Sequence, residues 1–390
     1  MITLLILIII YLSFISLGLP DSLLGSAWPS MSPLLNVPLH YAGFISMIIA
    51  GGTVVSSILS EKIIRRFGTG VVTAVSVLMT AAALIGFSFS RVFWPLFLCA
   101  IPLGLGAGSV DAALNNYVAL HYKARHMSWL HCFWGIGASL GPIIMSAFLI
   151  HKNSWNLGYR TIGIIQFCLV AVLFASLPLW KKNNAQKTAT QQHNSIKLKQ
   201  LLHIVGVKHI LAAFFCYCAI ETVTGLWGSS YLVMAKNISP KIAAQWIALY
   251  YIGITSGRFI SGFVTMKLNN RQMIRLGQII TGGGIIVLLL PFGNSTLLPG
   301  LFMIGLGCAP IFPSLLHETP NNFGGEFSQA IMGIQMASAY IGTTLMPPIF
   351  GWFASHIGFN IFPIFIGIIL IIKIIMVETL NRKIDNKNRK

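Results

Sequence analysis

Apolar stretches of about twenty residues recur along this chain and are separated by short polar connections. Backbone groups inside a bilayer must bond to one another, so only helices and closed barrels can span it, and stretches of this length select helices. A composition that is 55% hydrophobic and only 9% charged agrees with this, because a soluble domain carries about 25% charged residues. The sequence therefore predicts an all-α polytopic membrane protein.

The length of the chain predicts twelve transmembrane helices in two six-helix halves. The one long polar stretch, rich in Lys, Gln and Asn, separates an N-terminal half (residues 1–180) from a C-terminal half with a tail (209–390), and residues 181–208 form the linker. The expected spans are residues 3–28, 41–64, 70–90, 92–120, 128–150, 156–180, 209–234, 243–267, 273–292, 297–317, 327–354 and 358–380.

The basic residues predict how the spans are oriented. Of the 26 Lys and Arg residues, nineteen fall on the side that holds both termini and the linker, five on the other side, and two (Arg258 and Lys373) inside spans. Because cytoplasmic loops carry the excess of Lys and Arg, we expect a multi-pass protein of the cell (inner or plasma) membrane with both termini in the cytoplasm. The formal charge of +18 is thus assigned to membrane topology and not to nucleic-acid binding.

The two halves repeat short sequences at nearly constant offsets. Residues 103–107 (LGLGA) match 304–308 (IGLGC) 201 residues later, and residues 136–142 (IGASLGP) match 341–347 (IGTTLMP) 205 residues later. The loop at Lys62 matches the loop at Lys267, again with an offset of 205. Three matches in order indicate a parallel repeat of two six-helix units, with a binding site expected between them near the middle of the membrane.

The chain resembles the major facilitator superfamily in its twelve-span layout, in the turn RRFGTG (65–70) and in Gly137-x-x-x-Gly141-Pro142. Five further stretches resemble its fucose permease-like branch, which contains sugar:proton symporters: LPD (19–21), GAGSVDAALN (106–115), LHCFWG (130–135), GR (257–258) and APIFP (309–313). The resemblance implies a secondary transporter that works by alternating access and imports a small neutral solute, a sugar above all, together with protons. Sodium is the alternative coupling ion.

Three carboxylates lie within spans, Asp21, Asp111 and Glu221, although the whole chain has only eight acidic residues. An ionised group at mid-membrane costs about 2.5–3.5 kcal/mol on insertion scales, so it usually has a function. Desolvation disfavours a charged carboxylate, which lets such groups exchange protons near neutral pH. The resemblance implies proton-coupling roles for Asp111 and Asp21; the alternatives are that Asp111 ties helices together and that Asp21 only caps its helix.

Three spans carry side chains suited to binding a solute. Asn115 follows Asp111 by four residues and therefore projects from the same helix face. Glu221 and Trp227 share the most polar span and could bind a sugar by hydrogen bonding and ring stacking, or Glu221 could pair with a neighbouring helix. His131 is expected to bind solute, to relay protons or to be structural. Trp134 is well placed to line a cavity.

Arg65, Arg66 and Arg258 are the predicted gating residues. The superfamily's loop after the second helix carries an Asp before its basic pair, and this chain has Arg65 at that position. The resemblance therefore implies an altered cytoplasmic latch. Arg258 lies deep in a span and needs a partner, for which Glu318 or Glu326 is expected in preference to the solute.

Other classes of function have less support. The six cysteines form no Cys-x-x-Cys pair and no nucleophile triad is apparent, so the sequence predicts no metal site, no cofactor and no enzyme. A drug:proton antiporter uses similar acids, and a membrane sensor that binds a solute without moving it is a third hypothesis. We expect a monomer whose partners are a solute, protons and the lipid bilayer.

Overall fold

The computed structural model describes residues 2–122, 124–183 and 198–388, which form fifteen α-helices and two short 3-10 helices and, within these ranges, no strand. The α-helices are α1 (Ile2–Asp21), α2 (Leu23–Leu34), α3 (Tyr41–Phe67), α4 (Thr69–Phe89), α5 (Trp94–His121), α6 (Ala124–Lys152), α7 (Trp155–Asn183), α8 (Leu198–Leu201), α9 (Val207–Lys236), α10 (Pro240–Val264), α11 (Asn270–Leu289), α12 (Leu297–Cys308), α13 (Ile311–Phe323), α14 (Gly325–Ile357) and α15 (Phe362–Asn388).

Eleven segments of the described chain are long and apolar enough to cross a membrane. Two of them combine consecutive helices, α1 with α2 and α12 with α13. The remaining long helix, α14, has 33 residues but is less apolar, since Pro347 and Pro348 and several Ser, Thr and Gln residues interrupt it. Together they give the all-α, twelve-helix architecture that the sequence predicts.

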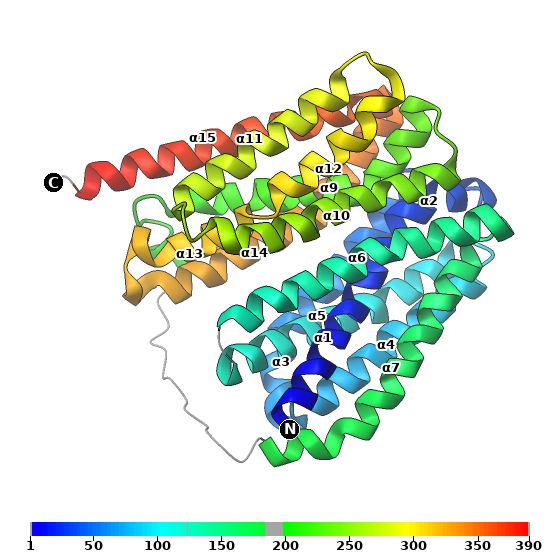
Figure 1. Ribbon diagram of the computed structural model, residues 1–390, viewed down its shortest axis with the longest axis horizontal. Coiled ribbons are helices and arrows are strands. Elements are labelled where there is room, and N and C mark those ends of the chain that lie inside the picture. Colours follow the sequence, from blue (N-terminus) through cyan, green and yellow to red (C-terminus); the bar gives the residue numbers. More distant parts are fainter. Residues whose placement is uncertain (1, 123, 184–197, 389–390) are drawn as a thin grey trace.

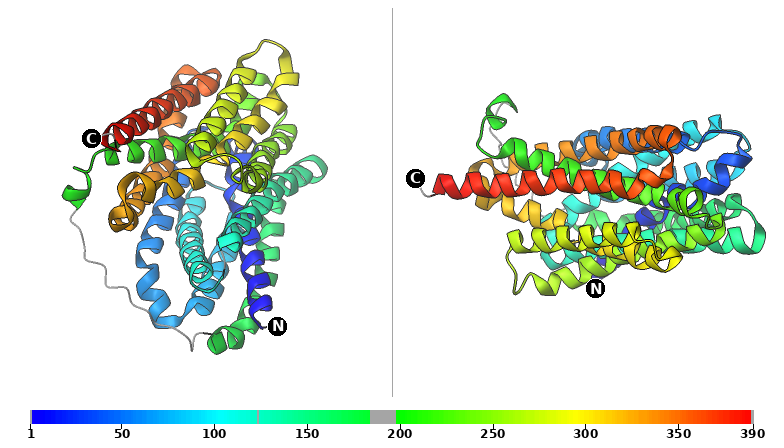
Figure 2. Two further views of the ribbon diagram at one scale, coloured as in Figure 1. Left: turned by 60° about the vertical axis from the view of Figure 1, so that its left-hand side comes forward. Right: turned by 90° about the horizontal axis from the view of Figure 1, so that it is seen from above.

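The helices pack in two groups that follow the order of the chain (Figure 1; Figure 2, left). In the first group α4 packs on α5 and α7, α3 on α5, and α1 on α6; in the second α11 packs on α12 and α15, α10 on α12, and α9 on α14 and α15. Contacts of α6 with α10, α3 with α14 and α2 with α9 join the groups. We call the end where α1 begins and α7 and α15 end the terminal end, and the opposite end the distal end.

Glycine contacts recur in both groups at the offset seen in the sequence. A side chain at Gly104 would collide with the backbone of Ile49, and one at Gly305 with the backbone of Tyr250; both members of the second pair lie 201 residues beyond the first. Likewise Gly106 packs closely on α4, and Gly307 on α11. Small residues let helix backbones approach closely inside a membrane. The LGLGA and IGLGC segments therefore provide equivalent close helix contacts in the two groups.

The first span is broken at Ser22, between α1 and α2. Pro20 has no N–H, so the carbonyl of Ser16 lacks its helical partner. Gln166 on α7 replaces it, since its Nε2 donates to Ser16 O at 2.7 Å, and Thr80 in turn donates to Gln166 Oε1 at 2.9 Å. The break brings Asp21 to the end of α1, in the middle of the span.

The expected end of the first span at residue 28 is wrong, because α2 continues to Leu34. Trp28 and Met31 on this segment are fully buried. Packing therefore keeps the segment helical through Pro29 and Pro33.

Candidate functional site

Four side chains form a continuous chain of contacts between the two helix groups. Asp21 Oδ2 accepts a hydrogen bond of 2.7 Å from Trp134 Nε1. The guanidinium carbon of Arg258 lies over the Trp134 ring, 4.8 Å from its centroid, and Arg258 Nη2 lies 3.5 Å from Glu221 Oε1. Asp21 and Trp134 belong to α1 and α6, whereas Glu221 and Arg258 belong to α9 and α10, so this chain crosses the interface at mid-depth.

Arg258 is held by three kinds of interaction. Besides the ring of Trp134 and the carboxylate of Glu221, its Nη1 donates to the backbone oxygen of His131 at 3.4 Å. The side chains of Arg258 and Glu221 are 17% and 20% exposed, so they are shielded but not sealed from water. A buried charge is tolerated when it is paired, and this pairing accounts for an arginine inside a span.

Glu221 and Asp21 differ in how far water reaches them. Tyr250 donates to the backbone oxygen of Glu221 at 3.0 Å, which holds α10 against α9 at this level. Asp21 is exposed although it stands at the middle of a span. Asp21 is therefore the more exposed of the two residues in this conformation.

Asp111 and Asn115 lie together on α5, as their spacing predicts. Asn115 Nδ2 donates to Asp111 Oδ1 at 2.8 Å and to Asp111 O at 3.0 Å. Both side chains are partly buried. The amide therefore holds the carboxylate in place in this conformation, and Asn115 is a partner of Asp111 as well as a candidate ligand for a solute.

The three intramembrane acids share one region. Asp21 lies within electrostatic range of both Asp111 and Glu221. Two tyrosines with no role predicted from the sequence also belong here. Tyr251 on α10 lies within electrostatic range of Asp21 and Glu221, and Tyr340 on α14 lies within electrostatic range of Asp111. Tyrosines in apolar spans resemble interface anchors, so nothing in the sequence distinguished these two.

His131 contributes its backbone to the chain of contacts, and its partly exposed ring lies within electrostatic range of Arg258. The ring meets Phe14 of α1 edge to face, with centroids 6.0 Å apart. His131 thus lies beside the site, on the same helix as Trp134, and its side chain packs within the first helix group.

Trp227 lies apart from the other predicted site residues. It is fully buried, packs against Phe350 and Phe359, and donates from Nε1 to Pro347 O at 2.8 Å. The structure therefore places it in the packed interior of the second group, where its ring faces are covered. The sequence suggested a stacking role because the indole lies on the same helix as Glu221. The sequence of one helix does not determine which of its faces packs against other helices.

A buried lysine was also not assigned a role from the sequence. Lys373 on α15 is 1% exposed, and its Nζ lies 5.5 Å from the centroid of the Tyr217 ring. Tyr217 is itself buried, one turn before Glu221, and lies within electrostatic range of it. The second group therefore carries a positive charge behind the site.

One of the two predicted partners of Arg258, Glu318, does not pair with it in the structure. Glu318 does not meet Arg258 but lies at the terminal end, where its Oε1 accepts from Arg271 Nε at 3.3 Å. The side chain of Glu326 lies outside the described part of the chain. The other two predicted gating residues, Arg65 and Arg66, are exposed at the terminal end of α3.

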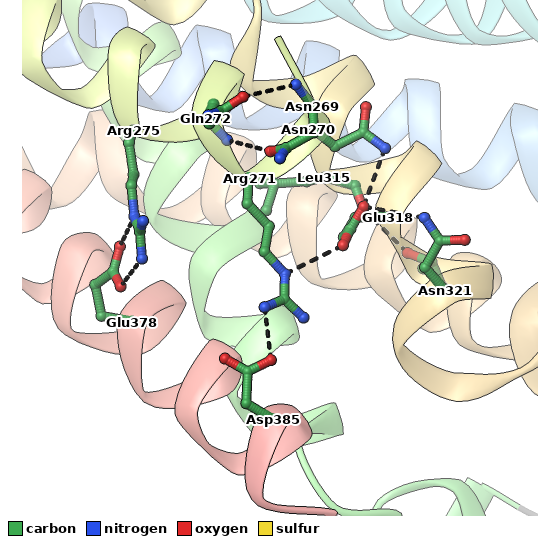
Figure 3. A network of polar contacts seen from close by, with 11 residues as sticks. Asn269, Asn270, Arg271, Gln272, Arg275, Leu315, Glu318, Asn321, Glu378 and Asp385 are labelled. Atoms are coloured by element: carbon green, nitrogen blue, oxygen red, sulfur yellow. Dashed lines mark hydrogen bonds and ion pairs between the residues drawn. The ribbon is translucent and has the colours of Figure 1, made fainter. Parts of the chain in front are cut away.

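Arg271 and Glu318 belong to a network that ties together α11, α13 and α15 (Figure 3). Arg271 also meets Asp385 at 2.7 Å, and Arg275 holds Glu378 through two bonds of 2.8 and 2.7 Å. All five residues belong to the second helix group. The network therefore braces the terminal end of one group and does not connect it to the other.

The contacts that join the two groups extend from mid-depth to the distal end. Gly25 on α2 packs against the backbone of Gly225, and Gly43 on α3 packs against Pro348. Ser146 Oγ donates to Lys241 O at 2.9 Å, also near the distal end. These close contacts hold the two groups together on the distal side of the site in this conformation.

Comparisons with known proteins agree with this architecture. Residues 10–244 and 210–389 match the family described as the Major Facilitator Superfamily. The glucose/mannose transporter GlcP of Bacillus subtilis is 24% identical over 357 residues, which cover 88% of this chain and 86% of that protein. The cis,cis-muconate transport protein of Acinetobacter baylyi is 22% identical, with 88% and 86% of the two chains covered. The crystal structure of a mutant of the nucleoside transporter NupG superposes with a TM-score of 0.75 at 14% identity, over 96% of this chain and 98% of that one.

Proposed function

Because this chain belongs to the Major Facilitator Superfamily, we propose that it is a secondary transporter that imports a small neutral solute, a sugar, together with protons. The observation that carries the proposal is the chain of contacts from Asp21 through Trp134 and Arg258 to Glu221, which crosses the two helix groups at mid-depth. Residues of both helix groups form this site, so any movement of one group relative to the other changes it. Alternating access requires a site of this kind.

The balance of charge supports coupling to protons. Asp21 lies within electrostatic range of both Asp111 and Glu221, and of these three carboxylates Glu221 is the one that pairs with Arg258. Negative charge in excess of positive charge is costly where water is scarce. Protonation of Asp111 and Asp21 relieves this excess, so we assign them the coupling role.

One of the named relatives supports a sugar as the solute. The glucose/mannose transporter GlcP is similar over 88% of this chain. Asn115, Glu221 and Trp134 offer an amide, a carboxylate and an indole, which are groups that can bind hydroxyls and the apolar face of a sugar ring. The predicted ligand Trp227 is fully buried and the ring of His131 packs on Phe14, so we leave both out of the proposed site.

The distribution of basic residues indicates which side of the membrane each end of the protein faces. The excess of Lys and Arg at the terminal end supports a cytoplasmic location for this end. Since the contacts at Gly25, Gly43 and Ser146 join the two groups on the distal side, we propose that the site communicates with the cytoplasm in this state. Opening the distal end requires these contacts to separate.

The test is to remove one proton-binding group at a time. Asp111→Asn keeps the shape of a protonated carboxyl group but cannot titrate. In proteoliposomes we expect it to abolish accumulation of a sugar driven by a pH gradient and to retain counterflow exchange, because exchange needs no proton release. Asn116→Ala, which changes an exposed neighbour on α5, is the matched control and should keep both activities.

Asp21→Asn identifies which acid couples. If Asp111→Asn keeps gradient-driven accumulation and Asp21→Asn loses it, Asp21 is the coupling group and Asp111 is structural. If both variants and their double mutant accumulate the sugar as the wild type does, proton coupling through these acids is wrong. Absence of any uptake or exchange by the wild type with a panel of sugars would contradict the sugar assignment itself.

A further inference from the structure

A second polar pocket lies at the distal end, away from the site between the two helix groups. Its volume is about 420 Å³. It lies between the end of α2, the connection from α4 to α5 and the start of α7. The residues that line it are Leu34, Leu35, Ser88, Phe89, Ser90, Arg91, Trp155, Asn156 and Arg160.

Two arginines give this pocket a positive charge that no described carboxylate compensates. The guanidinium of Arg160 lies over the Phe89 ring, 4.8 Å from its centroid, while its Nε is buried and has no hydrogen-bond partner. Arg91 is exposed, and the ion pairs of the described chain do not include it. A buried donor without a partner costs free energy, which a bound acceptor would recover.

The remaining polar groups give the pocket a defined shape. Asn156 Nδ2 donates to Ser88 O at 3.0 Å and so fastens the start of α7 to the end of α4. Ser90 Oγ donates to Gly86 O at 3.0 Å. The pocket also lies at the N-terminal end of α7, a helix of 29 residues whose dipole adds positive potential there.

The pocket lies at the depth where the membrane spans end. Phe89 is the last residue of one apolar span, and Trp155 is the first residue of another. This is the level of lipid headgroups, where tryptophan is enriched. Around it Leu34, Phe89 and Trp94 are 65%, 66% and 71% exposed, which provides an apolar border beside the charged pocket.

We propose that this pocket binds a phosphate group. Arginine is suited to phosphate because its planar fork donates two parallel charge-assisted hydrogen bonds, and here two arginines line one cavity. Either a phospholipid headgroup or a soluble phosphate has this chemistry. The apolar border favours the lipid, because acyl chains would cover it while the headgroup meets Arg91 and Arg160.

The experiment measures binding of defined phosphates to the whole purified protein. We would titrate detergent-solubilised protein with phosphatidylglycerol, with phosphatidylcholine and with inorganic phosphate, and follow thermal stability by tryptophan fluorescence. Phosphatidylglycerol should raise the unfolding temperature more than phosphatidylcholine does. Arg160→Gln and Arg91→Gln should each weaken its apparent affinity about tenfold.

Lys152→Gln removes one exposed positive charge at the same end, outside the pocket, and is the matched control. It should leave the affinity unchanged. Because Arg91 is exposed, Arg91→Gln should fold even if Arg160→Gln does not. Stabilisation by inorganic phosphate that equals the effect of the lipid, and that both arginine variants lose, would identify a soluble phosphate as the source.

Two results would overturn the proposal. One is that neither phosphatidylglycerol nor phosphate stabilises the wild type more than phosphatidylcholine or chloride does. The other is that a folded Arg91→Gln variant keeps the affinity of the wild type while Lys152→Gln loses it. In that case the binding follows surface charge in general and not this pocket.

Discussion

At the terminal end, the loop between α3 and α4 in the first group and the loop between α10 and α11 in the second group differ in whether their arginines are paired with carboxylates. In the second group, the loop between α10 and α11 leads into Arg271, which bonds to both Glu318 and Asp385. Asn269 caps α11 with a complete capping box, and Asn270 donates to Glu318 at 3.0 Å. The loop is therefore anchored on three sides.

In the first group, the corresponding loop between α3 and α4 has positive charge without such anchoring. Arg65 and Arg66 are both exposed, and Arg66 lies over the ring of its neighbour Phe67 at 5.4 Å. Neither arginine contacts a carboxylate in the part of the chain whose side chains are described. The turn itself needs Gly68, whose φ of 82° strains any other side chain.

This difference shows that helix packing and charge pairing vary independently between the two repeats. The glycine contacts at Gly104 and Gly305 are equivalent, so both groups keep the same close helix packing. Among the side chains that the structure describes, ion pairs between a loop arginine and a carboxylate are found in the second group. We infer that α11, α13 and α15 move as one braced unit.

The largest expected effect comes from breaking the brace at Glu318, which is only 12% exposed and accepts from Arg271, Asn270 and Asn321. Glu318→Ala leaves these donors without their acceptor, which should cost about 1–3 kcal/mol of stability. The measurement is thermal unfolding of purified protein in detergent. Glu378→Gln, in a pair that is 53% and 31% exposed, is the milder control. An unchanged unfolding temperature for Glu318→Ala would show that the network does not brace the group.

A smaller effect is expected from giving the first group the acid it lacks. Arg65→Asp restores the carboxylate that the superfamily loop normally carries and should strengthen closure of the terminal end. A partly exposed ion pair contributes about 0.2–1 kcal/mol, which corresponds to a shift of about 1.4- to 5-fold in the ratio of the two conformations.

The shift can be read from a cysteine at the distal contact. Ser146→Cys, in a background without the native cysteines, replaces a buried hydroxyl that bonds to Lys241 O, so labelling by a water-soluble thiol reagent reports opening of the distal end. Arg65→Asp should raise the labelling rate, and Arg65→Lys should not. If Arg65→Asp leaves the rate unchanged, the latch of the first group is built elsewhere.

The smallest effect is expected at Asp385, whose side chain is 52% exposed in its pair with Arg271. Asp385→Asn should lower stability by about 0.2–1 kcal/mol at low salt and by less as salt rises, because exposed pairs are weak and screened. Thermal unfolding at two ionic strengths measures this. A loss as large as that of Glu318→Ala, or one independent of salt, would mean that Asp385 and not Glu318 anchors Arg271.

The sequence alone determined the class and the layout of this protein. Runs of apolar residues predict helices because a membrane leaves the backbone no other partner, and this depends on local composition. The spacing of Asp111 and Asn115 predicted their contact for the same reason, since residues four apart on a helix are always neighbours. The repeat of LGLGA and IGLGC predicted equivalent helix packing because small residues set how closely backbones approach.

Only the tertiary structure decided which charged and aromatic groups meet. Arg258 pairs with Glu221 on the adjacent helix and not with Glu318, and the ring of Trp134 rather than that of Trp227 lies in the site. Both outcomes depend on the rotation of each helix about its axis, which is set by packing against neighbours distant in sequence. The sequence shows which residues share a helix face, but not which neighbouring helix that face contacts. The partner of a buried charge is therefore determined only when the helices pack together.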